Sequence, residues 1–311
     1  MRVVFFGTPE IAIPALDALL DSRQEVVGVV TRPDRPRGRS GKPVESPVRS
    51  RAQSAGLRVL TPERPEGEGF LAKLAGLAPD CIATCAYGGI LAQSVLDLPP
   101  RGCVNLHFSL LPAYRGAAPV QRALLAGERT VGVCTFRMTA GTDEGPIYAS
   151  LPVEVDLEEN SGDLKNRLAV LGAGLLLGTL DGIEEGAIVP VEQDHDLATY
   201  APKVTPAEAQ LDWRWPAYRL ARAVRAFTPS PGAWTLMRGH RLKVLRARAV
   251  DGRSGGAGVI ELGAELRVGT GEGWLELLAV QMEGKRPVGG ADFARGARIE
   301  SGDLLGGAKP G

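Results

Sequence analysis

The chain has 311 residues, of which 44% are hydrophobic and 23% are charged, an ordinary composition for a globular protein in water. Lysine plus arginine and aspartate plus glutamate both number 36, so the net charge indicates neither a nucleic-acid nor a membrane partner. The length predicts two domains, and the lack of a signal peptide or a long apolar segment predicts a cytoplasmic protein with no membrane contact.

The charges are distributed unevenly along the chain. Residues 140–200 contain 13 acidic and 2 basic residues, whereas residues 212–248 contain 9 basic and 1 acidic. Residues 32–51 form a second basic segment, with 7 basic and 2 acidic residues. Two separated basic segments in a neutral chain predict a surface that binds an anion.

The four cysteines lie in apolar, strand-like segments without the short paired spacing of a zinc site. We therefore expect small buried hydrophobic side chains with reduced thiols, and no metal site, at Cys81, Cys85, Cys103 and Cys134.

The amino-terminal elements predict a parallel sheet. A β-branched and aromatic segment at residues 2–7 is followed by Thr8, an expected helix N-cap, by Pro9 at the first helical position, and then by a second strand at residues 25–30. This β-α-β order is typical of parallel strands joined by right-handed crossovers. The first turn lacks the Gly-x-Gly-x-x-Gly fingerprint, which argues against a nicotinamide or flavin enzyme.

Two loops in this half have alternative interpretations. The aperiodic segment at residues 32–42, rich in arginine, proline and glycine, is either a solvated loop or a loop that contacts phosphates. Gly88 and Gly89 follow a predicted strand at 80–86, and they permit either the close approach of a ligand or a tight turn. Helices are predicted at 47–55, 70–77 and 92–98, with a short strand at 57–60.

The centre of the chain holds a strand at residues 103–107. Alternation along this strand places Asn105 and His107 on one face, and a loop with Pro112 and Gly116 leads to a helix at about 118–126. A second strand at 131–138 ends in a polar, glycine-rich loop that contains Asp143. An antiparallel strand is expected at 147–155, followed by a helix at 161–180 and a poorly patterned connection at 182–198.

A second unit begins near Pro206. Its predicted helix, 215–227, carries Arg219, Arg222 and Arg225 in a cationic stripe, and short strands with glycine-rich turns follow. This pattern predicts a small barrel of the oligonucleotide-binding type. We therefore expect an α/β fold, with a Rossmann-like, mostly parallel sheet in residues 1–189, a linker in 190–205 and an OB-like barrel in 206–311. The predicted barrel strands are 233–237, 242–249, 259–262, 265–268 and 274–280.

Asn105, His107 and Asp143 are the candidate catalytic residues. Neither a serine or cysteine nucleophile beside a base nor a Gly-x-Ser-x-Gly motif is present, so an acyl-enzyme is not indicated. An amide and an imidazole facing one pocket can stabilise an oxyanion, and a carboxylate can hold the imidazole or accept a proton. This chemistry suits direct acyl transfer to an amine. A structural histidine is the alternative, and spacing alone does not place Asp143 near His107.

Several motifs together resemble the methionyl-tRNA formyltransferase family, within the wider group of 10-formyltetrahydrofolate enzymes. The resemblance covers nearly the whole chain. Its motifs are Gly7-Thr-Pro, Arg32-Pro-Asp-Arg35, Ala86-Tyr-Gly, Asn105-Leu-His-Phe-Ser-Leu-Leu-Pro112, Arg115-Gly-Ala-Ala-Pro-Val-Gln121, Asp143 in Gly-x-Asp-x-Gly, Arg225-Ala-Phe and Pro231-Gly-Ala-Trp234.

The resemblance implies transfer of the formyl group of 10-formyltetrahydrofolate to the α-amino group of methionine on initiator tRNA, by a monomer without a metal. Asn105 and His107 would stabilise the oxyanion, His107 would assist departure of the folate nitrogen, and Asp143 would orient His107 and accept a proton. Folate contacts are implied for Tyr87, Gly88, Ile90, Ser109, Leu110, Leu111 and Pro112. Contacts with tRNA are implied for Arg35, Arg37, Arg39, Lys42, Arg219, Arg222, Arg225, Arg241 and Lys243.

Three positions depart from the family pattern. Phe108 stands where a small residue is usual, Gly89 replaces a larger residue, and Ser230 replaces a tryptophan between two prolines. Two alternatives are a formyltransferase for a nucleotide or nucleotide-sugar amine and an RNA-binding protein with a degenerate enzyme domain. The basic loop and the barrel argue against the first, and the intact catalytic trio argues against the second.

Overall fold

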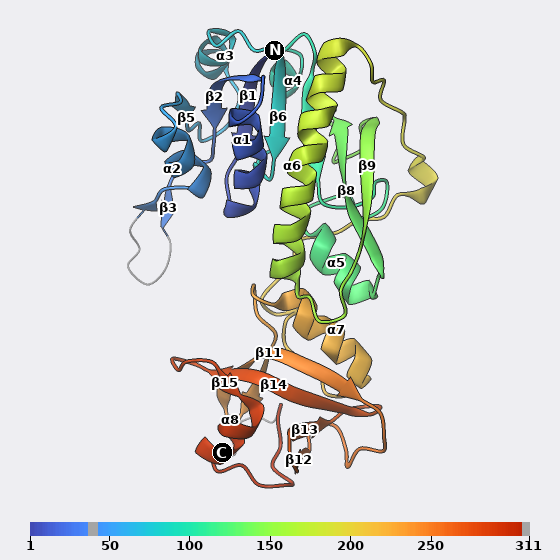
Figure 1. Cartoon of the computed structure of the whole chain (residues 1–311). Coiled ribbons are helices and arrows are strands. Elements are labelled where there is room, and N and C mark those ends of the chain that lie inside the picture. Colours follow the sequence, from blue (N-terminus) through green and yellow to red (C-terminus); the bar gives the residue numbers. More distant parts are fainter. Residues whose placement is uncertain (37–42, 307–311) are drawn as a thin grey trace. The chain divides into compact units, whose positions relative to one another are not determined.

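A computed structural model describes residues 1–36 and 43–306 (Figure 1). The chain forms two compact units, each of which collects separate stretches of sequence. The first unit comprises Met1–Pro119, Thr130–Glu154 and Lys165–Ala201, and the second comprises Val120–Arg129, Val155–Leu164 and Pro202–Gly311. Among the described residues, no helix is both long and apolar enough to cross a membrane.

The first unit is built on one seven-stranded sheet with the order β5-β2-β1-β6-β7-β8-β9. The first five strands in this order are parallel, and β8 and β9 are antiparallel additions. The mostly parallel sheet and the antiparallel strand after residue 146 are therefore confirmed. The strands are β1 (Arg2–Gly7), β2 (Glu25–Val30), β5 (Val59–Leu60), β6 (Cys81–Cys85), β7 (Cys103–His107), β8 (Thr130–Arg137) and β9 (Ile147–Glu154).

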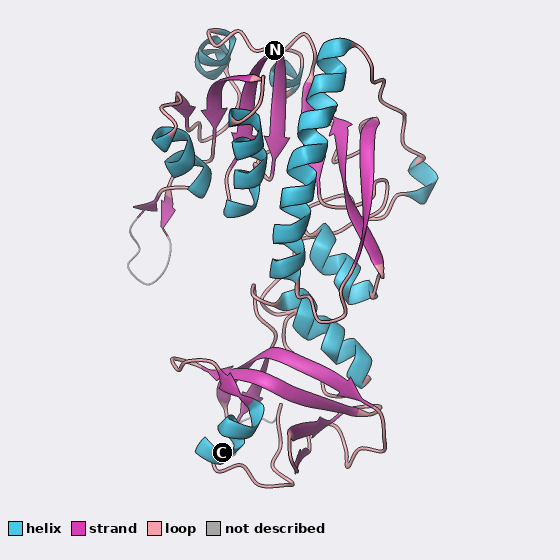
Figure 2. Ribbon diagram, viewed as in Figure 1, coloured by secondary structure: helices cyan, strands magenta, loops and turns pink. Residues whose placement is uncertain are grey.

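Helices cover both faces of this sheet, which explains why its central strands are continuously apolar. Every residue of β6 is buried. One face packs against α3 (Glu68–Ala75) and α4 (Gln93–Leu96), whose buried side chains join Val4, Phe6 and Ile82 in one cluster. The other face lies under α1 (Ile13–Leu20) and α6 (Ser161–Glu185), the helices drawn in front of the sheet in Figures 1 and 2.

Several local features differ from the predictions or were not predicted. Thr8 does not cap the first helix: its hydroxyl donates to the carbonyl of Tyr87 at 2.8 Å, and a 3₁₀ turn, η1 (Glu10–Ala12), precedes α1. Ser46 caps α2 (Pro47–Ser54) by accepting from the N–H of Arg49. Two-residue strands β3 (Arg35–Pro36) and β4 (Pro43–Val44) flank the basic loop. α6 continues five residues beyond the predicted Leu180, into the segment expected to be irregular.

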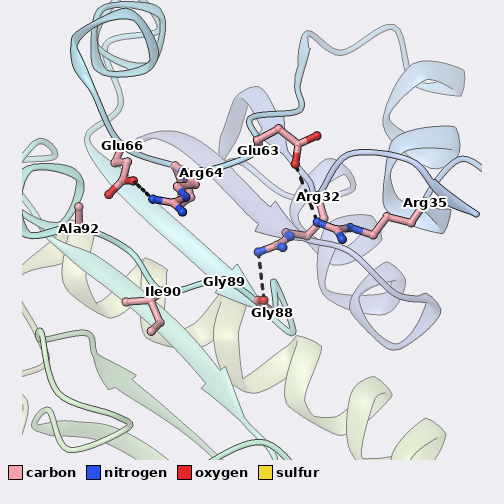
Figure 3. A pocket seen from close by; sticks show the side chains of 10 residues that line it. Arg32, Arg35, Glu63, Arg64, Glu66, Gly88, Gly89, Ile90 and Ala92 are labelled. Carbon is pink, nitrogen blue, oxygen red and sulfur yellow. Dashed lines mark hydrogen bonds and ion pairs between the residues drawn. The ribbon is translucent and has the colours of Figure 1, made fainter.

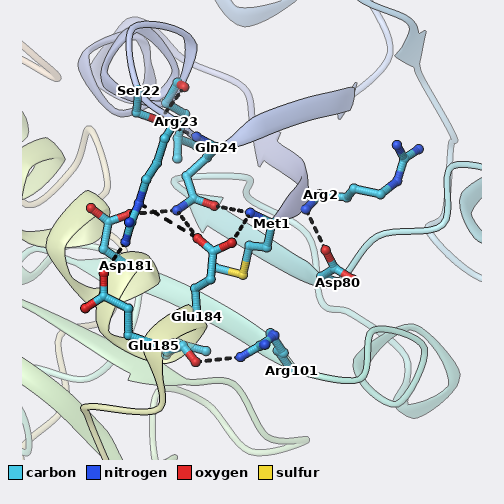
Figure 4. A network of polar contacts seen from close by, with 12 residues as sticks. Met1, Arg2, Ser22, Arg23, Gln24, Asp80, Arg101, Asp181, Glu184 and Glu185 are labelled. Carbon is cyan, nitrogen blue, oxygen red and sulfur yellow. Dashed lines mark hydrogen bonds and ion pairs between the residues drawn. The ribbon is translucent and has the colours of Figure 1, made fainter.

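Part of the acidic excess in residues 140–200 comes from carboxylates in the last turns of α6, which have partners in the first unit (Figure 4). Glu184 pairs with the Met1 amino group at 2.6 Å, and this hydrogen bond lowers the pKa of the Glu184 carboxyl. Asp181 accepts from Arg23 at 3.1 Å and from Gln24 at 2.6 Å. Arg23 also pairs with Glu185. These partners offset the unfavourable position of carboxylates near a helix carboxyl end.

The second unit contains an antiparallel sheet with the order β10-β11-β14-β13-β12 and β15 on β14. The helix α7 (Ala217–Phe227) packs on this sheet and buries Leu220, Val224 and Phe227 in its core. The predicted strands are confirmed, whereas β15 and α8 (Gly290–Gly296) were not predicted. The strands are β10 (Trp234–Met237), β11 (His240–Val250), β12 (Ile260–Leu262), β13 (Leu266–Gly269), β14 (Trp274–Met282) and β15 (Val288–Gly289). α5 (Pro119–Ala126) contributes most of its residues to this unit.

The sheet of the second unit curls into a half-barrel, and residues 303–306 link its two edges. The N–H of Leu305 donates to the carbonyl of Gly258 next to β12 at 2.9 Å, and the N–H of Gly306 donates to Leu236 in β10 at 2.8 Å. Because both outer strands find partners in this segment, the edges of the sheet are covered. The predicted C-terminal barrel is thus present as a curled antiparallel sheet.

Candidate functional site

A pocket of about 560 Å³ opens in the first unit where β6 and β7 end. The loop that follows β8 forms another part of its wall. The carboxyl ends of parallel strands are where α/β proteins place ligands, because loops from neighbouring strands converge there. The lining residues include Thr84, Ala86, Tyr87, Gly88, Gly89, Ile90, Asn105, His107, Phe108, Gly116, Met138, Thr142 and Asp143.

Asn105 and His107 enter the pocket from β7, two residues apart, as the alternation of the strand predicts. Asn105 is partly exposed, and among the described residues its amide has no hydrogen-bond partner. His107 is buried, with its ring edge-on to Phe136 at a centroid distance of 6.3 Å. The amide is therefore available to a ligand, while the imidazole is held by packing.

His107 lies between two acceptors. Its Nε2 is 3.1 Å from the carbonyl oxygen of Tyr114, and since a carbonyl only accepts, Nε2 carries the hydrogen. Nδ1 is 3.7 Å from Oδ2 of Asp143, which is within ion-pair range but beyond a direct hydrogen bond. A doubly protonated ring would thus have an oxygen facing each N–H. The structure brings together the two side chains that spacing alone could not place side by side.

The backbone holds the Asp143 carboxylate in position. Its Oδ2 accepts the N–H of Gly116 at 2.8 Å, which ties the loop after β8 to the loop after β7. Asp143 has φ of 52°, a left-handed conformation that aspartate tolerates better than most residues. Gly116 has φ of 114°, and a Cβ there would lie 3.0 Å from the carbonyl oxygen of Ala201, so glycine is required at this contact.

A buried arginine and a buried glutamine support both loops, and neither was among the site residues predicted from the sequence. Arg115 is 2% exposed and donates through its guanidinium to Oε1 of Gln193 at 2.8 Å. The Gln193 amide donates in turn to the carbonyls of Asp143 at 2.9 Å and Gly145 at 2.7 Å. The backbone N–H of Arg115 donates to the carbonyl of Thr199, and the N–H of Ala201 donates to the carbonyl of Arg115, so the main chain of this loop is also held in place. Gln193 lies in the patternless connection, where no sequence signal marks it.

The predicted folate contacts divide into two groups. Tyr87, Gly88 and Ile90 line the pocket. Ser109–Pro112 do not: Leu111 packs with Cys134 and Phe136, and the Ser109 hydroxyl donates to the carbonyl of Ala113 at 2.7 Å. These four residues shape the loop that carries Tyr114 and Arg115, and a direct contact between them and folate stays a prediction.

The structure shows what surrounds two of the three positions that depart from the family pattern, Gly89 and Phe108. A Cβ at Gly89 would lie 2.9 Å from the Tyr87 ring and 3.0 Å from the Arg32 guanidinium, so a larger residue would displace one of them. Phe108 lines the pocket and gives it an aromatic wall. Nothing in the structure explains Ser230.

Three arginines surround a second pocket, of about 600 Å³, which shares Gly88, Gly89 and Ile90 with the first (Figure 3). Arg32 donates to the carbonyl of Gly88 at 3.3 Å. Arg35 and Arg64 lie 3.8 Å from Glu63 and 3.6 Å from Glu66, respectively. These exposed pairs contribute little to stability and leave the arginines accessible. Arg37, Arg39 and Lys42, which were predicted to contact tRNA, lie outside the described residues.

The remaining basic candidates lie in the second unit, and one differs from the others. Arg219 stacks over the Trp215 ring at 4.0 Å, and Arg241 stacks over Trp234 at 4.4 Å. Arg222 lies over Tyr218 at 5.2 Å. Lys243 lines a groove on the barrel together with Arg241.

Arg225 is engaged within the second unit. Its Nε donates to the carbonyl of Glu159 at 2.8 Å and a terminal nitrogen donates to Asp156 at 2.6 Å. Burial lowers the pKa of its guanidinium. Its donors are thus directed at backbone carbonyls, and a contact between Arg225 and tRNA stays a prediction.

The cysteines are buried thiols without disulfide partners, as expected. Burial raises the pKa of Cys81, Cys85 and Cys134 to about 12, so these thiols are neutral and unreactive. Within the described residues, no group of three or more histidine, cysteine, aspartate or glutamate side chains is arranged to hold a metal ion.

Models of two formyl transferase domains match the chain, the formyl transferase domain over residues 1–180 and the formyl transferase C-terminal domain over residues 203–298. The chain belongs to the formyl transferase family. A methionyl-tRNA formyltransferase of Streptomyces griseus is 54% identical over 98% of this chain and 100% of its own length.

Solved structures share the fold at lower identity. HypX from Aquifex aeolicus superposes with a TM-score of 0.67 at 16% identity, over 97% of this chain and 48% of that one. A methionyl-tRNA formyltransferase from Clostridium thermocellum superposes with a TM-score of 0.56 at 15% identity, over 80% of this chain and 93% of its own. At these identities the likeness shows the fold alone.

Proposed function

We propose that this protein transfers the formyl group of 10-formyltetrahydrofolate to the α-amino group of methionine esterified to initiator tRNA. The observation that carries this proposal is the convergence of Asn105, His107 and Asp143 in one pocket of a formyl transferase. Relatives of about half identity over their full length, named methionyl-tRNA formyltransferase, support the tRNA substrate.

The proposed reaction needs no covalent enzyme intermediate. The methionyl amine attacks the formyl carbon, a C–N bond forms, and the carbonyl electrons move to oxygen. A hydrogen bond from the Asn105 amide and the positive charge of a protonated His107 stabilise this oxyanion. The amine gives up its proton to Asp143 through water, and the bond from the formyl carbon to N10 of the folate breaks. N10 receives the Nε2 proton of His107, which leaves the carbonyl of Tyr114 for this transfer.

The pocket has features that suit a folate. Phe108, Met138 and Tyr87 offer apolar surface to a flat heterocycle, while Asn105 and Thr84 present polar groups without partners in the described structure. This combination of apolar walls and a few polar groups is typical of small-molecule sites. We propose that the folate binds here with its formyl group beside Asn105 and His107.

The tRNA would contact the basic side chains. The stacked guanidinium groups of Arg219 and Arg241, with Lys243, are suited to the phosphate backbone. The arginines of the second pocket lie next to the catalytic pocket, where the end of the tRNA that carries methionine must arrive. We further propose that the protein acts as a monomer in the cytoplasm, where aminoacyl-tRNA is used.

The direct test supplies 10-formyltetrahydrofolate and charged initiator tRNA to the purified protein. We expect N-formylmethionine after hydrolysis of the ester, detected by mass spectrometry. A nucleotide-sugar amine in place of the tRNA serves as the matched control. Formylation of that amine without formylation of methionyl-tRNA would overturn the assignment of the substrate and favour the nucleotide-sugar alternative.

A further inference from the structure

Thr84 has a buried hydroxyl without a partner. It lies in β6, its exposed fraction is 4%, and its Oγ1 makes no hydrogen bond in the described structure. Such a group costs free energy, since it loses its water and gains nothing in return. Valine has almost the same shape and would fill the position without this cost, so packing does not explain a threonine here.

The other buried threonines of the described structure have hydrogen bonds. Thr135 and Thr179 bond each other at 2.7 Å, and Thr31 bonds Ser46 at 2.8 Å. Thr235 accepts from Trp213 at 3.0 Å, and Thr270 donates to the carbonyl of Glu272 at 2.6 Å. Thr84 is the exception in this group, and it is also the one that lines the catalytic pocket.

Thr84 is a neighbour of the catalytic amide. It is in register with Asn105 on β7 and with Phe6 on β1, and side chains at registered positions share one face of a sheet. Tyr87, two residues after β6, also lines this pocket, and its buried hydroxyl likewise has no partner in the described structure. Two residues that line the pocket thus have unpaired hydroxyls, which points to a ligand with several polar atoms.

We propose that the bound folate supplies the missing partner of Thr84, through a hydrogen bond to the polar edge of its pteridine ring. Thr84 is then a specificity-determining residue for the co-substrate, an inference that rests on the proposed function. The folate fits better than the methionyl group, because a thioether is only a weak acceptor, whereas the pteridine edge carries amide and amino groups. The hydroxyl thus reduces the stability of the empty protein in favour of binding.

The test compares Thr84→Val and Thr84→Ser with the wild type. Titration calorimetry with tetrahydrofolate should show about fivefold to tenfold weaker binding by Thr84→Val, the effect of removing one hydrogen bond of ~1–1.4 kcal/mol. The KM for 10-formyltetrahydrofolate should rise by the same factor, with kcat and the KM for tRNA unchanged. The melting temperature of ligand-free Thr84→Val should rise, and Thr84→Ser should keep the wild-type affinity.

Thr135→Val is the matched control, because it removes a buried hydroxyl that has a partner. It should lower the melting temperature and leave the affinity for tetrahydrofolate unchanged. Wild-type affinity in Thr84→Val would overturn the inference, as would a lower kcat at unchanged KM, which would mean that Thr84 acts through Asn105. A wild-type protein that does not bind tetrahydrofolate would instead refute the proposed function.

Discussion

Asp143 has two tasks at the level of single residues. Its carboxylate fixes the loop after β7 through the N–H of Gly116, and the same oxygen faces Nδ1 of His107. Because one atom serves both interactions, removal of the carboxylate would release the loop and eliminate the charge beside the imidazole. The Gln193 amide in addition donates to the backbone carbonyl of Asp143.

We expect His107→Ala and Asp143→Ala each to lower kcat by about 10²–10⁴, the usual contribution of a positioned acid or base. Affinity for tRNA should remain almost unchanged, because neither side chain belongs to the basic surfaces. Steady-state kinetics and a tRNA binding titration measure the two effects. Asp97→Ala, an exposed aspartate bonded to Gln93, is the control and should keep wild-type turnover. Near-wild-type kcat in either site variant would refute the catalytic roles.

Strand alternation was sufficient to predict that Asn105 and His107 share a face. It could not bring Asp143 to His107, since the contact depends on a left-handed residue in a loop 36 positions away and on Gly116 between them. Gln193 was beyond prediction for a related reason: it acts through hydrogen bonds to backbone carbonyls of a distant loop, and such bonds leave no periodic pattern in the sequence.

At the level of elements, the half-barrel depends on the short segment 303–306 that links its edges. Leu305 is 4% exposed and pairs with the backbone of Met237, while its neighbour Leu304 is 56% exposed. The strands β10 to β14 were predictable because alternation and glycine-rich turns mark them. The linking segment was not predictable. Its two leucines, which lie between glycines and an aspartate, give no sign of which two strand edges they join.

We expect Leu305→Ala to lower the free energy of unfolding by about 2–4 kcal/mol, since it removes a buried leucine and leaves a cavity. Leu304→Ala, one residue away and exposed, should change it by no more than about 0.5 kcal/mol. Urea denaturation followed by tryptophan fluorescence measures both variants, because Trp213 and Trp234 belong to the same core. Equal effects of the two substitutions would show that the link does not stabilise the barrel.

At the level of the whole molecule, the neutral net charge conceals two opposite distributions. Many acidic residues pair within the first unit, as in the contacts of Arg23 and Met1 with α6, whereas Arg219 and Arg241 lie on aromatic rings with their charge available. The uneven charge was visible in the sequence. The engagement of Arg225 with backbone carbonyls was not, since it depends on a segment 66 positions earlier.

Replacing Arg37, Arg39 and Lys42 with glutamine should weaken tRNA binding and flatten its dependence on salt. For each tRNA phosphate that the variant no longer neutralises, the slope of log K against log salt should decrease in magnitude by about 1. Binding titrations at several salt concentrations measure this slope. Lys73→Gln, an exposed lysine on α3, is the control and should leave it unchanged. An unchanged slope in the triple variant would show that the basic loop does not bind tRNA.

The second unit draws on stretches that precede its main segment, and this limits how the protein can be dissected. Arg225 donates to the carbonyls of Asp156 and Glu159, and Arg222 donates to the carbonyl of Ala126 at 3.3 Å. An excised fragment that starts at residue 203 would leave both guanidinium groups without these acceptors. Chimaeras that exchange the barrel between relatives must therefore transplant residues 120–129 and 155–164 with it.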